Sequence, residues 1–263
     1  MKNLLKVFFV LSLCFPVLFH GCKSSEQNPL QIAVSKSSMN YENWLLQVDT
    51  SLKLINLYGL PLDSAAIVLR QCDGLLLTGG DDVFPGWYNQ LADTALCEGF
   101  DPYRDSLEMM SIKIAKGLRM PVVGVCRGLQ ILNIEAGGSL FADLSKLHPS
   151  EISHRCQDWR NCFHQVTVDT LSQLFMLFKQ KEGLVNTNHH QGIDRLGNML
   201  LVSAWSSDSI PEAIEANPEQ YSGFLIGVQW HPERLAENQN YSKPLASAFI
   251  EHAIIFRNRI ETK

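Results

Sequence analysis

A cysteine between two glycines is the first feature of this sequence that could do chemistry. Cys126 lies in the stretch GVCRGLQ, directly after the apolar segment MPVV. The pattern Gly-x-Cys-x-Gly has the form of a nucleophile elbow, in which a strand turns sharply into a helix and exposes the middle side chain. A helix that begins there would favour the thiolate of Cys126, because the first turn offers free N–H groups. The alternative is a small buried cysteine that ends a core strand.

A nucleophilic cysteine needs a base, and the tripeptide His231-Pro232-Glu233 can supply one. His231 can accept the thiol proton, and Glu233 can orient the imidazole and stabilise its charged form. In a strand-like segment residues two apart point the same way, so we expect Glu233 to reach the ring of His231. A strand-end histidine with a chance acidic neighbour is the alternative, and the combination with GVCRGLQ favours catalysis.

Attack on a carbonyl also needs N–H groups that hold the developing oxyanion. The backbone N–H of Arg127, the residue after the nucleophile, is one candidate. The turn Thr78-Gly79-Gly80 offers a second at Gly80, where a glycine lets substrate approach the backbone. A plain strand-ending turn is the alternative for this second stretch.

Strands and helices that alternate along the first half of the chain must position these groups. The segments QIAVS, KLINLYG, GLLLTGG and MPVVGV are predicted as strands, and residues 40–48, 62–70, 104–118 and 127–138 as helices. Such alternation favours a parallel sheet covered on both faces, whose ligands gather at the carboxyl ends of the strands. The second half is richer in strands, with HQVTVDT, LLVSAW and GFLIGVQW.

The N-terminus has the composition of an export signal. Two lysines precede an apolar run from Val7 to Phe19, which is too short for a membrane span. We expect a signal peptide over 1–21, a polar tether over 22–29 and one hydrolase domain over 30–263. The sequence around Cys22 resembles a bacterial lipoprotein processing site, so we expect lipidation of Cys22 and a location in the periplasm or on a membrane of the cell envelope. Plain secretion and a retained anchor are the alternatives.

Composition excludes some partners. The chain has 263 residues, a net charge of −5 and no basic run, which makes it a poor nucleic-acid binder. The expected partner is a small substrate, and the only expected membrane contact is the N-terminal lipid.

Two further cysteines lie in the unusual stretch HRCQDWRNCFH. Cys156 and Cys162 could form a disulfide, remain free thiols, or bind zinc together with His154 and His164. The spacing matches no common zinc finger and export favours oxidation, so we predict the disulfide and assign no metal site.

Several motifs, in order and over most of the chain from Gln31 to Leu235, resemble one known family. They are LLLTGGDDVFPGWY, GVCRGLQILNIEAGG, VNTNHHQGID, EAIE and GVQWHPE. They resemble the class I glutamine amidotransferase-like proteins of the γ-glutamyl-γ-aminobutyrate hydrolase type. The resemblance implies an α/β, flavodoxin-like fold with a central, mostly parallel sheet, flanking helices and a β-rich second half.

The same resemblance implies an activity and its residues. Cys126, His231 and Glu233 would form a triad that hydrolyses a γ-glutamyl amide or peptide through a γ-glutamyl thioester, without a cofactor, and Gly80 and Arg127 would hold the oxyanion. Gln130 matches a position that helps to hold the glutamyl head group. His189 and His190 fall near the active site as candidate substrate contacts, with a hydrogen-bonded loop scaffold as the alternative. The leaving amine, the D or L preference and the oligomeric state stay open.

Two rival functions fit the same motifs. An ammonia-supplying amidotransferase subunit would need a synthetase partner, and export away from ATP argues against it. A surface binding protein with an inactive site would not require the intact triad.

Overall fold

The computed structural model describes residues 28–235 and 240–262. The expected signal peptide over 1–21, Cys22 and residues 22–27 of the expected tether lie outside the described residues. Within the described ranges, no helix combines the length and apolar character that a membrane crossing requires.

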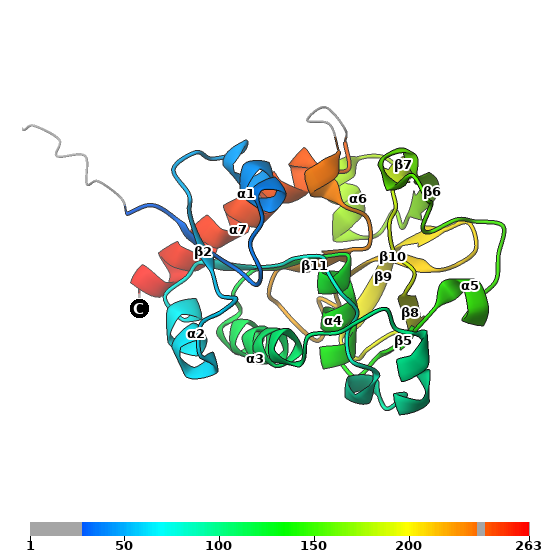
Figure 1. Cartoon of the computed structure of the whole chain (residues 1–263). Helices are drawn as coiled ribbons and strands as arrows, with labels where there is room; N and C mark the ends of the chain where they lie inside the picture. The colour runs from blue at the N-terminus through cyan, green and yellow to red at the C-terminus, as the bar shows by residue number, and fades with distance from the viewer. Residues whose placement is uncertain (1–27, 236–239, 263) are drawn as a thin grey trace, which may run out of the picture.

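One nine-stranded sheet runs through the molecule (Figure 1). Five neighbouring strands pair in parallel, in the order β2 (Lys53–Asn56), β1 (Gln31–Val34), β3 (Gly74–Leu77), β4 (Val122–Val125) and β11 (Leu225–Val228). The sheet continues in antiparallel pairs through β10 (Pro211–Ala216), β9 (Leu200–Ser206), β6 (Phe163–Val168) and β7 (Glu182–Asn186). A small second sheet pairs β5 (Ser139–Phe141) with β8 (Gly192–Arg195).

Helices cover both faces of the parallel part (Figure 1). One face carries α1 (Met39–Leu46) and α7 (Lys243–Glu261), and α6 (Gln173–Phe178) packs beside α7 against β9 of the antiparallel part. The other carries α2 (Leu62–Leu69), α3 (Pro102–Leu118) and α4 (Arg127–Glu135). The remaining helical pieces are short: α5 (Leu144–Leu147) and the 3₁₀ turns Pro85–Tyr88, Leu91–Leu96, Trp159–Asn161 and Pro232–Arg234.

Two apolar cores follow from these two layers. Leu76 of β3 and Val123 of β4 point into the core under α1 and α7. Their neighbours Leu75, Leu77 and Val122 point into the core under α2, α3 and α4. Both faces of each central strand are therefore buried, which explains why these strands are continuous apolar runs. The predicted α/β, flavodoxin-like fold is confirmed.

Besides β5, three strands of the second half that carry charged residues were not predicted from the sequence. They are β7, β8 and β10, with the sequences EGLVN, GIDR and PEAIEA. Their charged residues break the apolar alternation that indicates a strand, and pairing with neighbours decides their conformation instead.

Candidate active site

The turn between β4 and α4 holds Cys126 in a strained conformation. Its backbone has φ 53° and ψ −106°, a region that costs a residue other than glycine about 1–3 kcal/mol. The N–H of Cys126 donates to the carbonyl oxygen of Val228 at 2.8 Å, which ties the turn to β11. A Cβ on Gly128 would lie 2.3 Å from the carbonyl oxygen of Leu77, and one on Gly124 would lie 2.6 Å from the carbonyl carbon of Gly128. The two glycines therefore let α4 start directly against the sheet.

His231 lies just beyond the end of β11 and is held by its backbone and its ring. Its N–H donates to Oδ1 of Asn186 at 2.8 Å, and Nδ2 of Asn186 donates to the carbonyl oxygen of His231 at 2.9 Å. Nδ1 of the ring donates to Oε1 of Glu233 at 2.8 Å. The expected strand-like geometry here is wrong, because Pro232–Arg234 form a 3₁₀ turn that brings Glu233 back to the ring. Sequence reasoning did not identify Asn186 as this clamp, although it lies in the polar stretch VNTNHHQ.

Cys126 and His231 meet because β4 and β11 are parallel neighbours that end at the same edge. A Cβ on Gly79 would lie 3.1 Å from Cε1 of His231 and 3.5 Å from Cβ of Cys126, so both side chains face this glycine. Nε2 of His231 has no hydrogen-bond partner among the described residues. Burial lowers the pKa of His231, but the negative charges of Cys126 and Glu233 outweigh it and raise the pKa to about 9. The arrangement can hold a thiolate beside an imidazolium.

The two candidate oxyanion donors lie at the ends of adjacent parallel strands, β3 and β4. Neither the N–H of Gly80 nor that of Arg127 donates a hydrogen bond to a described residue. Gly80 has φ +153°, and a Cβ there would lie 2.1 Å from Nη1 of Arg104. Arg104 donates to the carbonyl oxygens of Thr78 at 2.8 Å and Gly79 at 3.0 Å, which fixes the turn that carries Gly80.

A buried network of four charges supports this turn and the start of α4. Arg127 binds Glu108 and Asp105 through its guanidinium, and Nε of Arg104 donates to Oε1 of Glu108 at 2.9 Å. All four side chains are at most 1% exposed. Burial alone would raise the pKa of Glu108, but Arg127 and Arg104 hold it below its usual value. Arg104, Asp105 and Glu108 all lie near the start of α3, so the structure buries the charged first turns of this helix completely.

A cavity of about 290 Å³ opens beside Cys126. Gly80, Gln130, His189 and His190 also line it. The amide nitrogen of Gln130 donates to the carbonyl oxygen of Gln191 at 3.2 Å, so Gln130 is held within the cavity wall. A substrate bound in this cavity can therefore bring its carbonyl group to both Cys126 and the N–H of Gly80.

Much of the remaining lining is charged. It includes Asp81, Asp82, Glu98 and Arg155. Nη1 of Arg155 donates to Oε1 of Glu98 at 2.7 Å, so the two signs of charge meet at this end of the cavity. Such a lining suits a polar ligand that carries both an amino and a carboxylate group.

The two neighbouring histidines separate into different environments. Nε2 of His190 lies 2.9 Å from Oδ1 of Asp82, and this carboxylate raises the pKa of His190 despite the opposing effect of burial. His189 is 4% exposed, and its Nδ1 lies 2.9 Å from the carbonyl oxygen of Gln191. Both line the cavity, but the ring nitrogens of His189 face interior partners.

The other cysteines of the described chain differ from Cys126. Cys156 and Cys162 are joined in a disulfide, while Cys72, Cys97 and Cys126 are free. Burial raises the pKa of the Cys72 thiol to about 12 and that of the Cys97 thiol to about 11. These two thiols are therefore poor nucleophiles at neutral pH.

Comparison with known proteins gives consistent results. The model of the peptidase C26 family matches residues 29–233. One relative is YvdE of Lactococcus lactis, named as a glutamine amidotransferase-like protein, which is 36% identical over 74% of this chain and 81% of its own. Another is the γ-glutamyl-γ-aminobutyrate hydrolase PuuD of Escherichia coli K12, which is 32% identical over 73% of this chain and 78% of its own.

Solved structures agree in fold. The glutaminase domain of Trypanosoma brucei CTPS, determined with bound acivicin, has a TM-score of 0.58 at 17% identity and covers 86% of this chain and 94% of its own. A glutamine amidotransferase of Methylobacillus flagellatus has a TM-score of 0.54 at 16% identity, with 88% of this chain and 94% of its own covered.

Proposed function

The chain belongs to the peptidase C26 family, and on this premise we propose that it is a cysteine hydrolase that cleaves γ-glutamyl amide bonds through a γ-glutamyl thioester. The family is glutamine amidotransferase-like, and membership of it supports an activity that hydrolyses a C–N bond. The finer assignment draws on the hydrolases among the relatives, such as PuuD at 32% identity. The observation that supports it most strongly is Cys126 on a strained elbow that faces the paired side chains of His231 and Glu233.

Formation of the thioester begins with the proton already on His231. A pKa of about 9 keeps His231 protonated at neutral pH, so that its imidazolium lies beside the sulfur of Cys126. The sulfur attacks the γ-carbonyl carbon of the substrate, and the negative charge that develops on its oxygen is held by the N–H groups of Gly80 and Arg127. When the tetrahedral intermediate collapses, the C–N bond breaks and His231 gives its proton to the leaving amine.

Hydrolysis of the thioester uses the same groups in reverse. Neutral His231 takes a proton from a water molecule, and the resulting hydroxide attacks the thioester carbonyl. The C–S bond then breaks, glutamate leaves, and the proton on His231 again faces the Cys126 thiolate. Glu233 keeps Nδ1 of His231 protonated throughout, so that Nε2 is always the nitrogen that exchanges protons.

The charged cavity lining supports a glutamyl head group as the recognised part. The α-amino group would face the carboxylates of Asp82 and Glu98, and the α-carboxylate would face Arg155 and His190. Gln130 would support the wall close to the reacting carbonyl. The amine side of the substrate would extend away from this end.

The test measures amine release from a panel of γ-glutamyl amides and free glutamine, together with intact-protein mass. Amine release from a γ-glutamyl amide, with a glutamyl adduct on the wild type and none on Cys126→Ala, supports the proposal. Cys72→Ala is the matched control, because it removes a free cysteine away from the site, and it should keep the activity. Release from glutamine alone would instead indicate an amidotransferase subunit. Neither release nor adduct over the whole panel would reject the hydrolase.

We also propose that the protein is exported and lipidated at Cys22. The basic and apolar composition of residues 1–21 supports this, as does the Cys156–Cys162 disulfide, which is typical of oxidising compartments. Mass analysis of the native N-terminus, compared with that of Cys22→Ala, tests it. An unmodified N-terminus that retains residues 1–21 would contradict it.

A further inference from the structure

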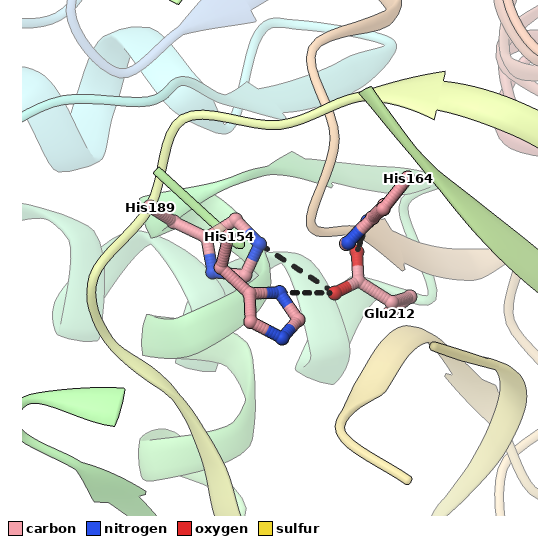
Figure 2. A group of neighbouring side chains, drawn as sticks. All are labelled: His154, His164, His189 and Glu212. Atoms are coloured by element: carbon pink, nitrogen blue, oxygen red, sulfur yellow. Dashed lines mark ion pairs between the residues drawn. The ribbon is translucent and has the colours of Figure 1, made fainter. Parts of the chain in front are cut away.

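Three histidines and one glutamate converge in the interior, in the β-rich half of the chain (Figure 2). His154 comes from the loop after α5, His164 from β6, His189 from the loop between β7 and β8, and Glu212 from β10. The four residues are at most 6% exposed. Their facing nitrogen and oxygen atoms all lie within 4.8 Å of one another.

The carboxylate of Glu212 lies at the centre of this cluster (Figure 2). Its Oε1 lies 3.3 Å from Nδ1 of His154 and 3.5 Å from Nε2 of His189, and its Oε2 lies 3.3 Å from Nε2 of His164. Neither carboxylate oxygen and none of these three nitrogens has a hydrogen bond to a described residue. Buried polar groups are nearly always partnered, so a group of five facing atoms without hydrogen bonds requires a cause.

The outer hydrogen bonds of two histidines decide which nitrogen carries a proton. Nδ1 of His189 faces the carbonyl oxygen of Gln191, which can only accept, so this nitrogen is the donor. Nε2 of His154 faces Oδ2 of Asp208 at 3.1 Å and is also a donor. In the neutral imidazoles, the inner nitrogens of His154 and His189 then present lone pairs to a carboxylate. Lone pairs that face a carboxylate in a buried space call for a cation between them.

We propose that His154, His164, His189 and Glu212 bind one Zn²⁺ ion in a closed tetrahedral site. Zinc takes imidazole nitrogen and carboxylate oxygen at about 2.0–2.2 Å, and a regular tetrahedron of that size has edges of about 3.3–3.6 Å. The distances from Oε1 of Glu212 to His154 and His189 match such edges, and so does the distance from Oε2 to His164. All four ligand atoms lie within 4.8 Å of one another, so binding would require the rings to move closer together. Three imidazoles also disfavour Mg²⁺ and Ca²⁺, which take oxygen ligands.

The residues around the cluster hydrogen-bond to its side chains, as the residues around the ligands of a metal site do. Asp208 and the carbonyl oxygen of Gln191 accept from the outer nitrogens of two ligands, which orients their rings and fixes their tautomers. Asp208 also accepts from Ser150 and Ser206, each at 2.5 Å. The carboxylates of Glu212 and Asp208 together balance a divalent cation, so the buried site is neutral overall.

The ion would join four segments, namely the loop after α5, β6, the loop between β7 and β8, and β10. The disulfide between Cys156 and Cys162 lies between His154 and His164 in the chain and brings their segments together. Because His189 lines the cavity next to His190, the bound ion would also fix the position of this part of the cavity wall. The sequence paired the histidines with these cysteines as the possible zinc ligands. The structure uses the cysteines in the disulfide and places Glu212 and His189 beside the histidines instead, so the proposal replaces the expectation of no metal site.

The test does not depend on the hydrolase activity. The protein is purified, stripped with a chelator and incubated with Zn²⁺, and bound zinc per chain is measured after gel filtration. We expect about one equivalent and, at 100-fold excess over the dissociation constant, a rise in Tm of about 5–10 °C. Replacement by Co²⁺ should give the intense visible absorption of a tetrahedral site. Fewer than about 0.1 equivalents in a folded wild type, or no tetrahedral Co²⁺ spectrum, would overturn the proposal.

Three variants locate the ion. Glu212→Gln keeps the shape of the side chain, removes one ligand charge and should weaken binding at least tenfold. His164→Gln removes a different ligand and serves if the first variant does not fold. Cys126→Ala removes another place where zinc could bind, between a thiolate and a histidine. Because the proposed ion lies in the cluster, this variant should still bind one equivalent. The control His252→Gln lies on α7 outside the cluster and should also bind one equivalent. Loss of zinc in Cys126→Ala, or full occupancy in both cluster variants, would refute this location.

Discussion

Replacement of Glu108 by glutamine tests the buried charge network behind the candidate oxyanion hole. In the wild type two carboxylates, Asp105 and Glu108, balance two guanidinium groups, Arg104 and Arg127, and all four are at most 1% exposed. The amide keeps the volume but leaves one positive charge without compensation. Breaking a buried pair in this way costs about 3–5 kcal/mol. For a domain of this size that is a fall in Tm of about 6–20 °C.

Activity should fall together with stability. Arg104 holds the carbonyl oxygens before Gly80, and the side chain of Arg127 anchors the start of α4. A displaced oxyanion donor costs up to about 10²–10³-fold in kcat, so we expect Glu108→Gln to lose between about 10-fold and 10³-fold with a smaller change in KM.

The assay combines thermal unfolding with steady-state kinetics on the substrate found in the panel. Glu135→Gln is the matched control, since it breaks the pair of Glu135 and Lys116 (2.7 Å), whose side chains are 8% and 19% exposed, and should cost only about 1 kcal/mol because water reaches this pair. A variant Glu108→Gln that melts within about 2 °C of the wild type would refute the reasoning, because that shift corresponds to less than about 1 kcal/mol.

The pH dependence of the stability difference between the wild type and Glu108→Gln gives a second check. The pKa of Glu108 is lowered in the folded protein, so its contribution is present above the unfolded pKa of about 4.3 and is lost as the pH falls through the folded value. The gap in stability between wild type and Glu108→Gln should therefore be constant near neutral pH and shrink in acid. A gap that grows as the pH falls would contradict this assignment.

Three further predictions follow from the site and its surroundings. Because the pKa of His231 is raised to about 9, its protonated form persists through neutral pH, and kcat/KM should decline only above about pH 9; a decline centred near pH 6.5 would contradict the ion pair. Iodoacetamide at pH 7.5 should alkylate Cys126 and spare Cys72, whose pKa is about 12, as peptide mass mapping would show; faster labelling of Cys72 would argue against the elbow. Replacing Cys156 and Cys162 by serine removes a cross-link over a separation of 6 residues and should cost about 2 kcal/mol of unfolding free energy in denaturant; an unchanged midpoint would mean that the disulfide does not constrain the unfolded chain.

Local sequence was sufficient to predict the elbow at Cys126. The requirement for Gly124 and Gly128 is steric and arises within a few residues of Cys126, where a Cβ would meet backbone atoms at 2.6 and 2.3 Å. His231 and Glu233 are likewise near neighbours in the chain. Their contact was therefore predicted correctly even though the expected strand is a 3₁₀ turn.

Contacts between distant segments required the fold. The polar strand β10 was not predicted, and its pairing with β9 and β11 is what carries Glu212 into the interior. The stretch HRCQDWRNCFH allowed a disulfide, free thiols or a metal site. Only the folded chain turns its two histidines inward to Glu212 while its cysteines bond to each other.

The sequence by itself determined the alternation of apolar strands and helices, the elbow at Cys126 and the histidine–glutamate pair, because each depends on periodicity or on spacing within one turn. The tertiary structure alone decided that β4 and β11 end side by side, that four charges beneath α4 are fully buried, and that three histidines share one carboxylate. The physical reason is that burial and charge pairing depend on which segments pack together, and that choice is made by the whole core rather than by any one segment.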